Sequence, residues 1–150
     1  MRPDVEYSVN VPVSVDAAFA AFLNLDRLLH RGIFAEALWT EGEPWKVGSR
    51  LRYELVKPLR ASITAVVMSI SPPRAATILN HALGITAEQH TSFGPDLKGG
   101  TRIHMTMMLV GKSTELTDKE VKDAVTFITR DALDSIVADC QKRANSASGS

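Results

Sequence analysis

The sequence is poor in the features that mark several large classes of protein. It has one cysteine, Cys140, so no disulfide can form within the chain. Seventeen basic residues balance seventeen acidic ones, and a zero net charge gives no general attraction to nucleic acid or to an anionic membrane. No apolar run approaches the roughly 18 residues of a membrane span, and no signal peptide precedes Pro3. We therefore expect a cytoplasmic protein that binds no nucleic acid and does not insert stably into a membrane.

Motifs for catalysis and metal binding are also missing. There is no G-x-S-x-G nucleophile motif, and the glycine-rich stretch 94–100 lacks the Lys-Ser/Thr ending of a phosphate loop. His81, His90 and His104 lie too far apart for a short ligand motif, and no cysteine or carboxylate falls at zinc-site spacing. We expect no metal and no cofactor, and we interpret Cys140 as a small core residue. The sequence names no catalytic residue.

The longest regular pattern that is present runs from Thr117 to Arg143. Thr117 followed three residues later by Glu120 is a capping box, in which two side chains satisfy free backbone N–H groups at a helix start. Apolar residues then recur at helical spacing along one side. They are Val121, Val125, Ile128, Ala132, Ile136 and Cys140, flanked by Ala124, Thr129 and Leu133. A stripe this broad needs a large concave partner, and the strands before it can supply one.

The residues before this helix favour two short helices and seven strands. Val5 to Val11 alternates as a half-buried strand, Ser14 can cap a helix that carries apolar residues to Leu23, and a second short helix covers 26–30. Six further strands are expected at 35–40, 49–56, 60–71, 75–81, 85–93 and 101–110. Proline and glycine fill the short gaps between them, which favours antiparallel hairpins. The predicted fold class is therefore α+β.

Tight turns would also fix which residues face each other across the sheet. Tyr53 would then lie opposite Thr64, and Thr64 opposite His81, in one polar row. Gln89 would lie opposite Thr77 on one side and opposite Met105 on the other. The inner, mainly apolar face would carry Leu51, Tyr53, Leu55, Thr64, Val66, Met68, Ile70, Leu79, Ile85, Ala87, Phe93, Ile103, Met105, Met107 and Leu109. The outer, charged face would carry Arg50, Arg52, Glu54, Glu88, His90, Arg102 and His104. On this face His90 would lie opposite His104.

Four short segments occur in an order typical of one superfamily. They are Pro12–Ser14 before an Ala/Phe helix, Trp45-Lys46-Val47-Gly48-Ser49 before a strand, Ser71-Pro72-Pro73-Arg74 between strands, and Gly99-Gly100-Thr101-Arg102 opening the last strand before the long helix. Val5 to Arg143 thus resembles the START-like helix-grip superfamily, also called SRPBCC, and within it the polyketide cyclase/dehydrase-like branch. The resemblance implies a curved antiparallel sheet of about seven strands that wraps around the C-terminal helix and encloses a cavity for a hydrophobic ligand. We accordingly expect one START-like domain at residues 1–145 and a flexible tail at 146–150.

The main functional prediction is that this cavity binds a small hydrophobic molecule, such as a lipid or a polyketide. Methionines on the inner face can fill a solid core or line an adaptable pocket. A buried polar group without a hydrogen bond costs about 1–3 kcal/mol. The side chains of Tyr53, Thr64 and His81 are therefore expected to form hydrogen bonds with one another, with water at the open end of the sheet, or with a ligand. The predicted ligand-binding residues are Tyr53, Thr64, Val66, Met68, His81, Gln89, Met105, Met107, Val125 and Ile128.

Two other functions stay open at this point. A cyclase or dehydratase-type enzyme acting on such a ligand would use Tyr53 and His81 as proton donor and acceptor. An interaction module, of the kind that regulates stress chaperones, would need an exposed apolar patch. No pattern in the sequence identifies the ligand, the pathway or the oligomeric state.

Overall fold

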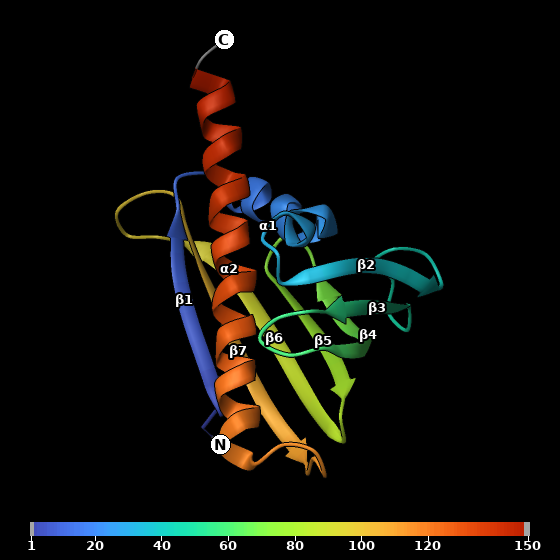
Figure 1. Ribbon diagram of the computed structural model, residues 1–150. Coiled ribbons are helices and arrows are strands. Elements are labelled where there is room, and N and C mark those ends of the chain that lie inside the picture. Colours follow the sequence, from blue (N-terminus) through green and yellow to red (C-terminus); the bar gives the residue numbers. More distant parts are fainter. Residues whose placement is uncertain (1, 149–150) are drawn as a thin grey trace.

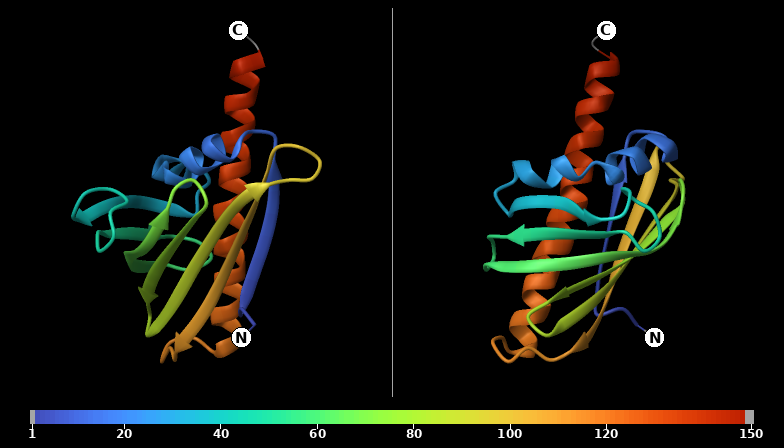
Figure 2. Two further views of the ribbon diagram at one scale, coloured as in Figure 1. Left: turned by 180° about the vertical axis from the view of Figure 1, so that it is seen from behind. Right: turned by 90° about the vertical axis from the view of Figure 1, so that its right-hand side faces the viewer.

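Seven antiparallel strands form one open, strongly curved sheet in the computed structural model, which describes residues 2–148 (Figure 1). The strands are β1 (Val5–Val11), β2 (Phe34–Glu41), β3 (Arg50–Leu55), β4 (Ala61–Ser71), β5 (Ala75–Ala82), β6 (Ile85–Pro95) and β7 (Thr101–Gly111). Their order across the sheet is β1-β7-β6-β5-β4-β3-β2, so β1, the first strand of the chain, forms one edge of the sheet and pairs with β7, the last strand. Figure 2 shows how the sheet curls around the long helix.

Three helices accompany the sheet in the described residues. The helix α1 (Val15–Leu23) starts at Ser14, whose hydroxyl accepts a hydrogen bond from the Ala17 backbone N–H at 3.2 Å. The 3₁₀ helix η1 (Leu25–His30) follows directly. The long helix α2 (Asp118–Ser148) begins with the predicted capping box, in which the Glu120 N–H donates to Thr117 Oγ1 at 3.1 Å and the Thr117 N–H donates to Glu120 Oε1 at 3.0 Å.

The predicted α+β class and order of elements are confirmed: an antiparallel sheet is followed by a long C-terminal helix, and short helices follow the first strand. The helix α2 continues five residues beyond the predicted end at Arg143 and includes residues 146–148 of the expected tail. Residues 149 and 150 of that tail lie outside the described residues. No helix in the described part of the chain is long and apolar enough to cross a membrane.

The apolar stripe of α2 has two halves that differ in packing. In the half nearer the C-terminus, Leu133, Ile136 and Cys140 are fully buried, each with 0% of its surface exposed. In the half nearer the N-terminus, Val125 and Ile128 are only half-buried although they lie on the same stripe. One half is therefore solid core, and the other faces open space inside the molecule.

The position of α2 explains this difference. Its backbone lies close to β1 and β7 at one edge of the sheet and to α1 and η1 at one end. In Figure 1 it crosses the concave side of the sheet along β1, while β2 and β3 extend away from it. A straight helix cannot touch the whole of a strongly curved sheet, so α2 stands away from the middle strands.

Two hairpins lie one residue away from the register predicted from the sequence. Thr64 pairs with Arg52 rather than Tyr53, and Thr77 pairs with His90 rather than Gln89. Because side chains alternate between faces, a shift of one residue moves a whole strand to the opposite face. The first shift exchanges the inner and outer faces of β4 and β5 relative to the prediction. The second shift returns β6 and β7 to their predicted faces. The predicted inward orientation was therefore wrong for Thr64, Val66, Met68, Leu79 and His81 and right for the inner residues of β3, β6 and β7.

The remaining pairings refine this picture. Thr64 does pair with His81, as predicted, although on the outer face. Met68 falls at an irregularity between the pairs Val67–Ile78 and Ser69–Thr77, and it is 47% exposed. A bulge of this kind leaves one residue without a partner and bends the strand.

The pairing predicted between β6 and β7 also differs. Gln89 lies opposite Met107 rather than Met105, a shift of two residues that leaves the faces unchanged. His90 pairs with Thr106, so the predicted pair of His90 and His104 is wrong. His104 instead contacts the hydroxyl of Ser8 through Nδ1 and the Glu6 carboxylate through Nε2, at 3.3 Å.

Two isoleucines of α2 provide a direct test of the two-halved stripe. We expect Ile136→Ala to lower the free energy of unfolding by about 2–5 kcal/mol, because it leaves a void in solid core. Ile128→Ala should cost less than about half of that, since the side chain already borders open space. Urea denaturation with linear extrapolation measures both values. Equal losses for the same change on the same helix would show that the stripe is evenly packed.

Candidate binding cavity

A partly enclosed cavity of about 140 Å³ lies between α2 and the middle of the sheet. On the helix side its wall is formed by Val121, Ala124, Val125, Ile128 and Ala132. On the sheet side it is formed by inward residues of five strands, namely Tyr53, Leu55, Ala61, Ile63, Ile78, Asn80, Ile85, Ala87, Gln89, Met105 and Met107. The residues that α2 contributes extend over about 16 Å of helix, at about 1.5 Å per residue. The cavity is thus the space left where α2 stands away from the sheet.

Aromatic rings close the end of the cavity near the short helices. Phe22 of α1 contacts Trp45, with ring centroids 5.2 Å apart, and the Trp45 indole N–H donates to the Leu23 carbonyl at 2.9 Å. Phe34 packs against Tyr53 at 5.6 Å between centroids. Trp45 has a φ of 61°, an uncommon conformation for a bulky residue. Its hydrogen bond to the end of α1 holds the indole in place as part of the cavity wall.

Arg27 lies at the same end and is the one lining residue that is both charged and buried, with 8% of its surface exposed. Its Nε donates to the Ala21 carbonyl at 3.1 Å, and Nη2 donates to the Phe22 carbonyl at 3.1 Å. These are carbonyls of the last turn of α1, where the usual helical partners run out; the Ala21 carbonyl also accepts from the N–H of the C-cap residue Asn24 at 3.2 Å. Nη1 donates to Ser135 Oγ at 2.7 Å and to the Ala132 carbonyl at 3.4 Å. Arg27 therefore connects α1 to α2.

Burial changes the acidity of both Arg27 and its neighbour Tyr53. Loss of hydration lowers the pKa of Arg27 to about 10, against the opposing effects of Tyr53, Asp139 and Asp131, so the side chain stays cationic at neutral pH. Loss of hydration raises the pKa of the Tyr53 phenol well above its ordinary value, although the charge of Arg27 works in the other direction. Tyr53 therefore carries its proton under physiological conditions and can act as a donor, not as a base.

Two amide side chains form a second polar group on the sheet wall. The Asn80 amide donates to Gln89 Oε1 at 3.2 Å and, with a longer contact, to the Ala87 carbonyl at 3.4 Å. These bonds use the Asn80 donors and leave the Asn80 oxygen and the Gln89 amide nitrogen without a partner among the described residues, and both residues line the cavity. The pair can therefore offer one acceptor and one donor to a molecule in the cavity.

The structure brings seven of the ten predicted ligand-binding residues to the cavity wall. They are Tyr53, His81, Gln89, Met105, Met107, Val125 and Ile128, and His81 reaches the wall only at its border, beside Ala82 and Leu83. Thr64, Val66 and Met68 do not line the cavity, because the register of β4 turns them to the outer face. Contact with a ligand stays a prediction for the seven that line the cavity.

The predicted polar row is wrong in its central feature. Tyr53 faces the cavity, whereas the side chains of Thr64 and His81 are exposed on the other side of the sheet. His81 borders the open end of the cavity beside Ala82 and Leu83, but its Nδ1 lies 3.1 Å from Thr86 Oγ1 on the outer face. The phenol and the imidazole therefore do not lie side by side on one face of the sheet, as the predicted row required.

The predicted ligand-binding set omitted many lining residues, and those with hydrogen-bonding side chains are Arg27, Trp45 and Asn80. Arg27 falls in a six-residue 3₁₀ helix that is too short to show periodicity. Asn80 would have been found from the correct register, because it lies opposite Ala87, which was assigned to the inner face. The conformation of Trp45 depends on its hydrogen bond to α1, which no local pattern encodes.

Nucleophilic catalysis by the cysteine and metal binding find little support in the structure. Cys140 is fully buried in the solid half of the core, and burial raises the pKa of its thiol to about 11. A protonated, inaccessible thiol is a poor nucleophile. Within residues 2–148, no three histidine, cysteine or acidic side chains gather where they could hold a metal ion.

Comparison with known proteins identifies the fold. No protein-family model matches the sequence, and no curated protein matches it. Among solved structures, the Zhui aromatase/cyclase from Streptomyces sp. R1128 is similar with a TM-score of 0.79 at 12% identity, covering 93% of this chain and 94% of that one. Ara h 8.0201 is similar with a TM-score of 0.74 at 14% identity, covering 91% and 96%.

A conserved protein from Geobacillus kaustophilus also matches, with a TM-score of 0.70 at 13% identity over 91% of this chain and 94% of that one. The chain has the helix-grip fold. The fold that the resemblance to the START-like superfamily implied is thus confirmed by the structural neighbours, and at identities this low the likeness concerns the fold alone.

The protonation of Tyr53 can be tested by alkaline titration. In the native protein, wild type and Tyr53→Phe should give the same rise in phenolate absorbance up to about pH 11, because the buried phenol does not ionise there. In strong denaturant the variant should lose half of the signal, since one of two tyrosines is gone. A smaller native signal in Tyr53→Phe would contradict the buried, protonated phenol.

Proposed function

We propose that the protein binds a small, mainly apolar molecule in the cavity between α2 and the sheet. The observation that carries this proposal is the contrast between the two halves of the α2 stripe. Val125 and Ile128 are kept half-buried at a site where fully buried packing would stabilise the fold by about 25 cal/mol for each Å² of apolar surface. Apolar side chains that line open space are typical of ligand pockets.

The size of the cavity limits the ligand. An engineered apolar cavity of about 150 Å³ in another protein binds benzene, and the present cavity has about 140 Å³ before any adjustment. A compact ligand of one or two rings, or a short chain, therefore fits better than a long lipid. Burying about 200 Å² of such a ligand contributes about 5 kcal/mol. That is close to the 4.1 kcal/mol of a millimolar Kd, so tighter binding needs polar contacts as well.

A cyclase or dehydratase function receives less support. Catalysis by proton transfer needs a donor and an acceptor that both reach the substrate. Among the described residues that line the cavity, only Arg27, Tyr53 and His81 carry an acidic or basic side chain, and the His81 ring contacts Thr86 on the outer face. Tyr53 supplies a donor, but no lining residue is placed to accept a proton at neutral pH.

An interaction module also receives less support. It would require a continuous apolar surface for a protein partner. The large apolar residues that are exposed come from six separate segments: Leu29, Val47, Met68, Leu97, Val110 and Phe127. Within residues 2–148, no helix or strand contributes more than one of them, whereas the cavity gathers apolar residues from both layers.

Filling the cavity should abolish binding without harming the fold. We expect the folded protein to bind the neutral probe 2-naphthamide with a negative heat-capacity change, the robust sign of apolar burial. Ala124→Phe places a ring in the cavity and should weaken binding at least about tenfold, which is about 1.4 kcal/mol. Isothermal titration calorimetry at several temperatures measures both quantities.

The matched control is Ala138→Phe, the same change at an exposed position of the same helix. It should bind the probe like the wild type. Failure of the folded wild type to bind any compact apolar probe would show that the cavity has no binding function. Equal affinity in the two variants would place the binding site elsewhere.

A further inference from the structure

The arginine at the closed end of the cavity has no carboxylate partner. Arg27 makes four hydrogen bonds, all to neutral oxygens of Ala21, Phe22, Ala132 and Ser135. Nη2 makes one of these bonds, so one of its two N–H groups has no partner among the described residues. A buried cation is ordinarily paired with an anion, because removing it from water is costly. Arg27 is an exception on a wall that a ligand can reach.

The charges around Arg27 do not neutralise it. The two carboxylates that act on it, Asp131 and Asp139, each have a cationic partner of their own. Asp131 Oδ1 accepts from Arg31 Nε at 2.6 Å, and Asp139 Oδ2 accepts from Arg143 Nε at 2.9 Å. The group thus holds three guanidinium ions against two carboxylates, which leaves one excess positive charge.

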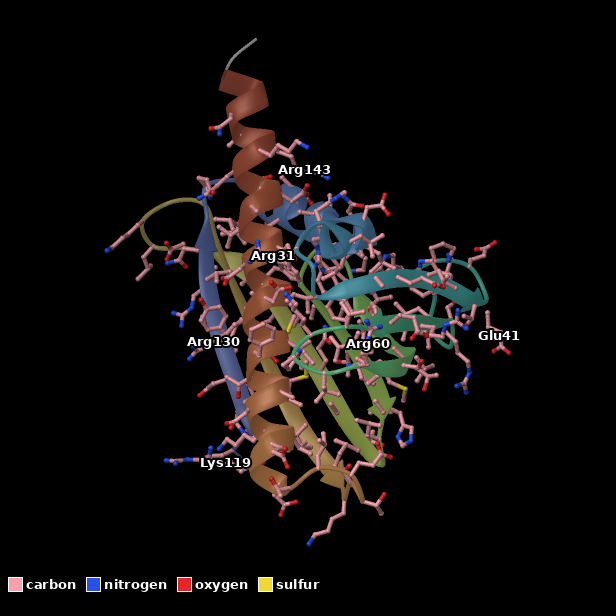
Figure 3. The ribbon with its side chains drawn as sticks, in the orientation of Figure 1. Arg31, Glu41, Arg60, Lys119, Arg130 and Arg143 are labelled. Carbon is pink, nitrogen blue, oxygen red and sulfur yellow. The ribbon has the colours of Figure 1, made fainter. Side chains whose placement is uncertain are left out.

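These two partner arginines lie away from the cavity wall. Neither Arg31 nor Arg143 lines the cavity. In Figure 3 Arg143 lies on the side of α2 that faces the short helices, whereas Arg130 lies on the β1 side. The one cation of the group that a ligand can meet is Arg27.

The Tyr53 hydroxyl adds an unused donor at the same place. Tyr53 lines the same cavity as Arg27. Its hydroxyl makes no hydrogen bond to another described residue, although the side chain is 91% buried, with 9% exposed. A buried phenol usually has a partner. A free donor and an uncompensated cation that line one cavity suit a ligand with an anionic oxygen.

We propose that the cavity selects apolar molecules that carry one acidic oxygen group, a carboxylate or an enolate, and binds that group between Arg27 and Tyr53. This inference rests on the proposed function and names the class of ligand. The cation is buried when the chain folds, so its desolvation is already complete before the ligand arrives. The anion loses its own hydration on entry and gains a fixed cation and a donor in return. A neutral ligand leaves Arg27 uncompensated, and a cationic ligand is repelled.

Three probes with one ring system test the inference: 2-naphthoate, 2-naphthamide and 2-naphthylmethylammonium. Their apolar bodies are the same and their charges at pH 7 are negative, zero and positive. Calorimetric titration of the wild type should give affinities in that order, with the anion bound at least about tenfold more tightly than the amide.

Arg27→Met removes the charge and keeps much of the side-chain length. The preference for the anion over the amide should fall to about one, while the amide still binds. Arg130→Met is the control, since it removes the same charge from the exposed side of α2 and should keep the preference. If Arg27→Met does not fold, Tyr53→Phe and Arg27→Lys replace it. Tyr53→Phe should weaken binding of the anion more than binding of the amide, and Arg27→Lys should retain part of the preference for the anion.

The outcomes separate the two proposals. If the amide binds as tightly as the anion in the wild type, the charge selectivity is refuted while the binding cavity stands. If the preference survives in folded Arg27→Met, Arg27 is not its source and the inference is overturned. If none of the three probes binds, the proposed function itself fails, and the inference fails with it.

Discussion

The structure depends on how α2 is held against a sheet that curves more strongly than the helix does. The helix is fixed along β1 and β7 and at its middle by α1 and η1, and the middle strands turn away from it. Leu133 to Cys140 fill the region where the layers meet, and Val121 to Ala132 face the region where they separate. The cavity is therefore a consequence of the geometry that builds the core, not an interruption of it.

Arg27 lies at the boundary between these two regions. Its contacts on α2 are Ala132, the last lining residue of the helix, and Ser135, one turn further into the solid core. Its other contacts satisfy carbonyls at the end of α1, where the helix dipole is negative. Helix carbonyls offer partial negative charge from several directions. They explain how a cation can be buried here without an ion pair, and why the excess charge persists on the cavity wall.

The sequence was informative wherever one periodicity dominated. The capping box at Thr117 and Glu120 and the stripe that follows predicted α2, and the alternation in β1 gave its bounds correctly. In β4 the pattern fails, because Ile63 and Val67 on one face compete with Val66 and Met68 on the other. Either register buries apolar residues, so the turn before β4 decides, and it lies one residue from the tight turn assumed. A compensating error in the turn between β5 and β6 returned the later strands to their correct faces.

The candidate site shows the same division between local and long-range information. Met105, Met107, Val125 and Ile128 could be assigned to the interior from alternation or helical spacing alone. Arg27 could not, since its burial results from contacts with Ala132 and Ser135, more than a hundred residues further along the chain.

Residues that give a cavity its chemistry are often those that contradict their local pattern. Their polar groups are stabilised by tertiary contacts that propensity does not describe. Arg27 is charged among the leucines of η1, and Asn80 is polar on a face where its neighbour Ile78 is apolar. Both exceptions lie on the cavity wall, where a polar group can meet a ligand instead of only its own chain. The apolar residues thus determine the shape of the space, and these few exceptions determine which molecules of that shape the cavity can distinguish.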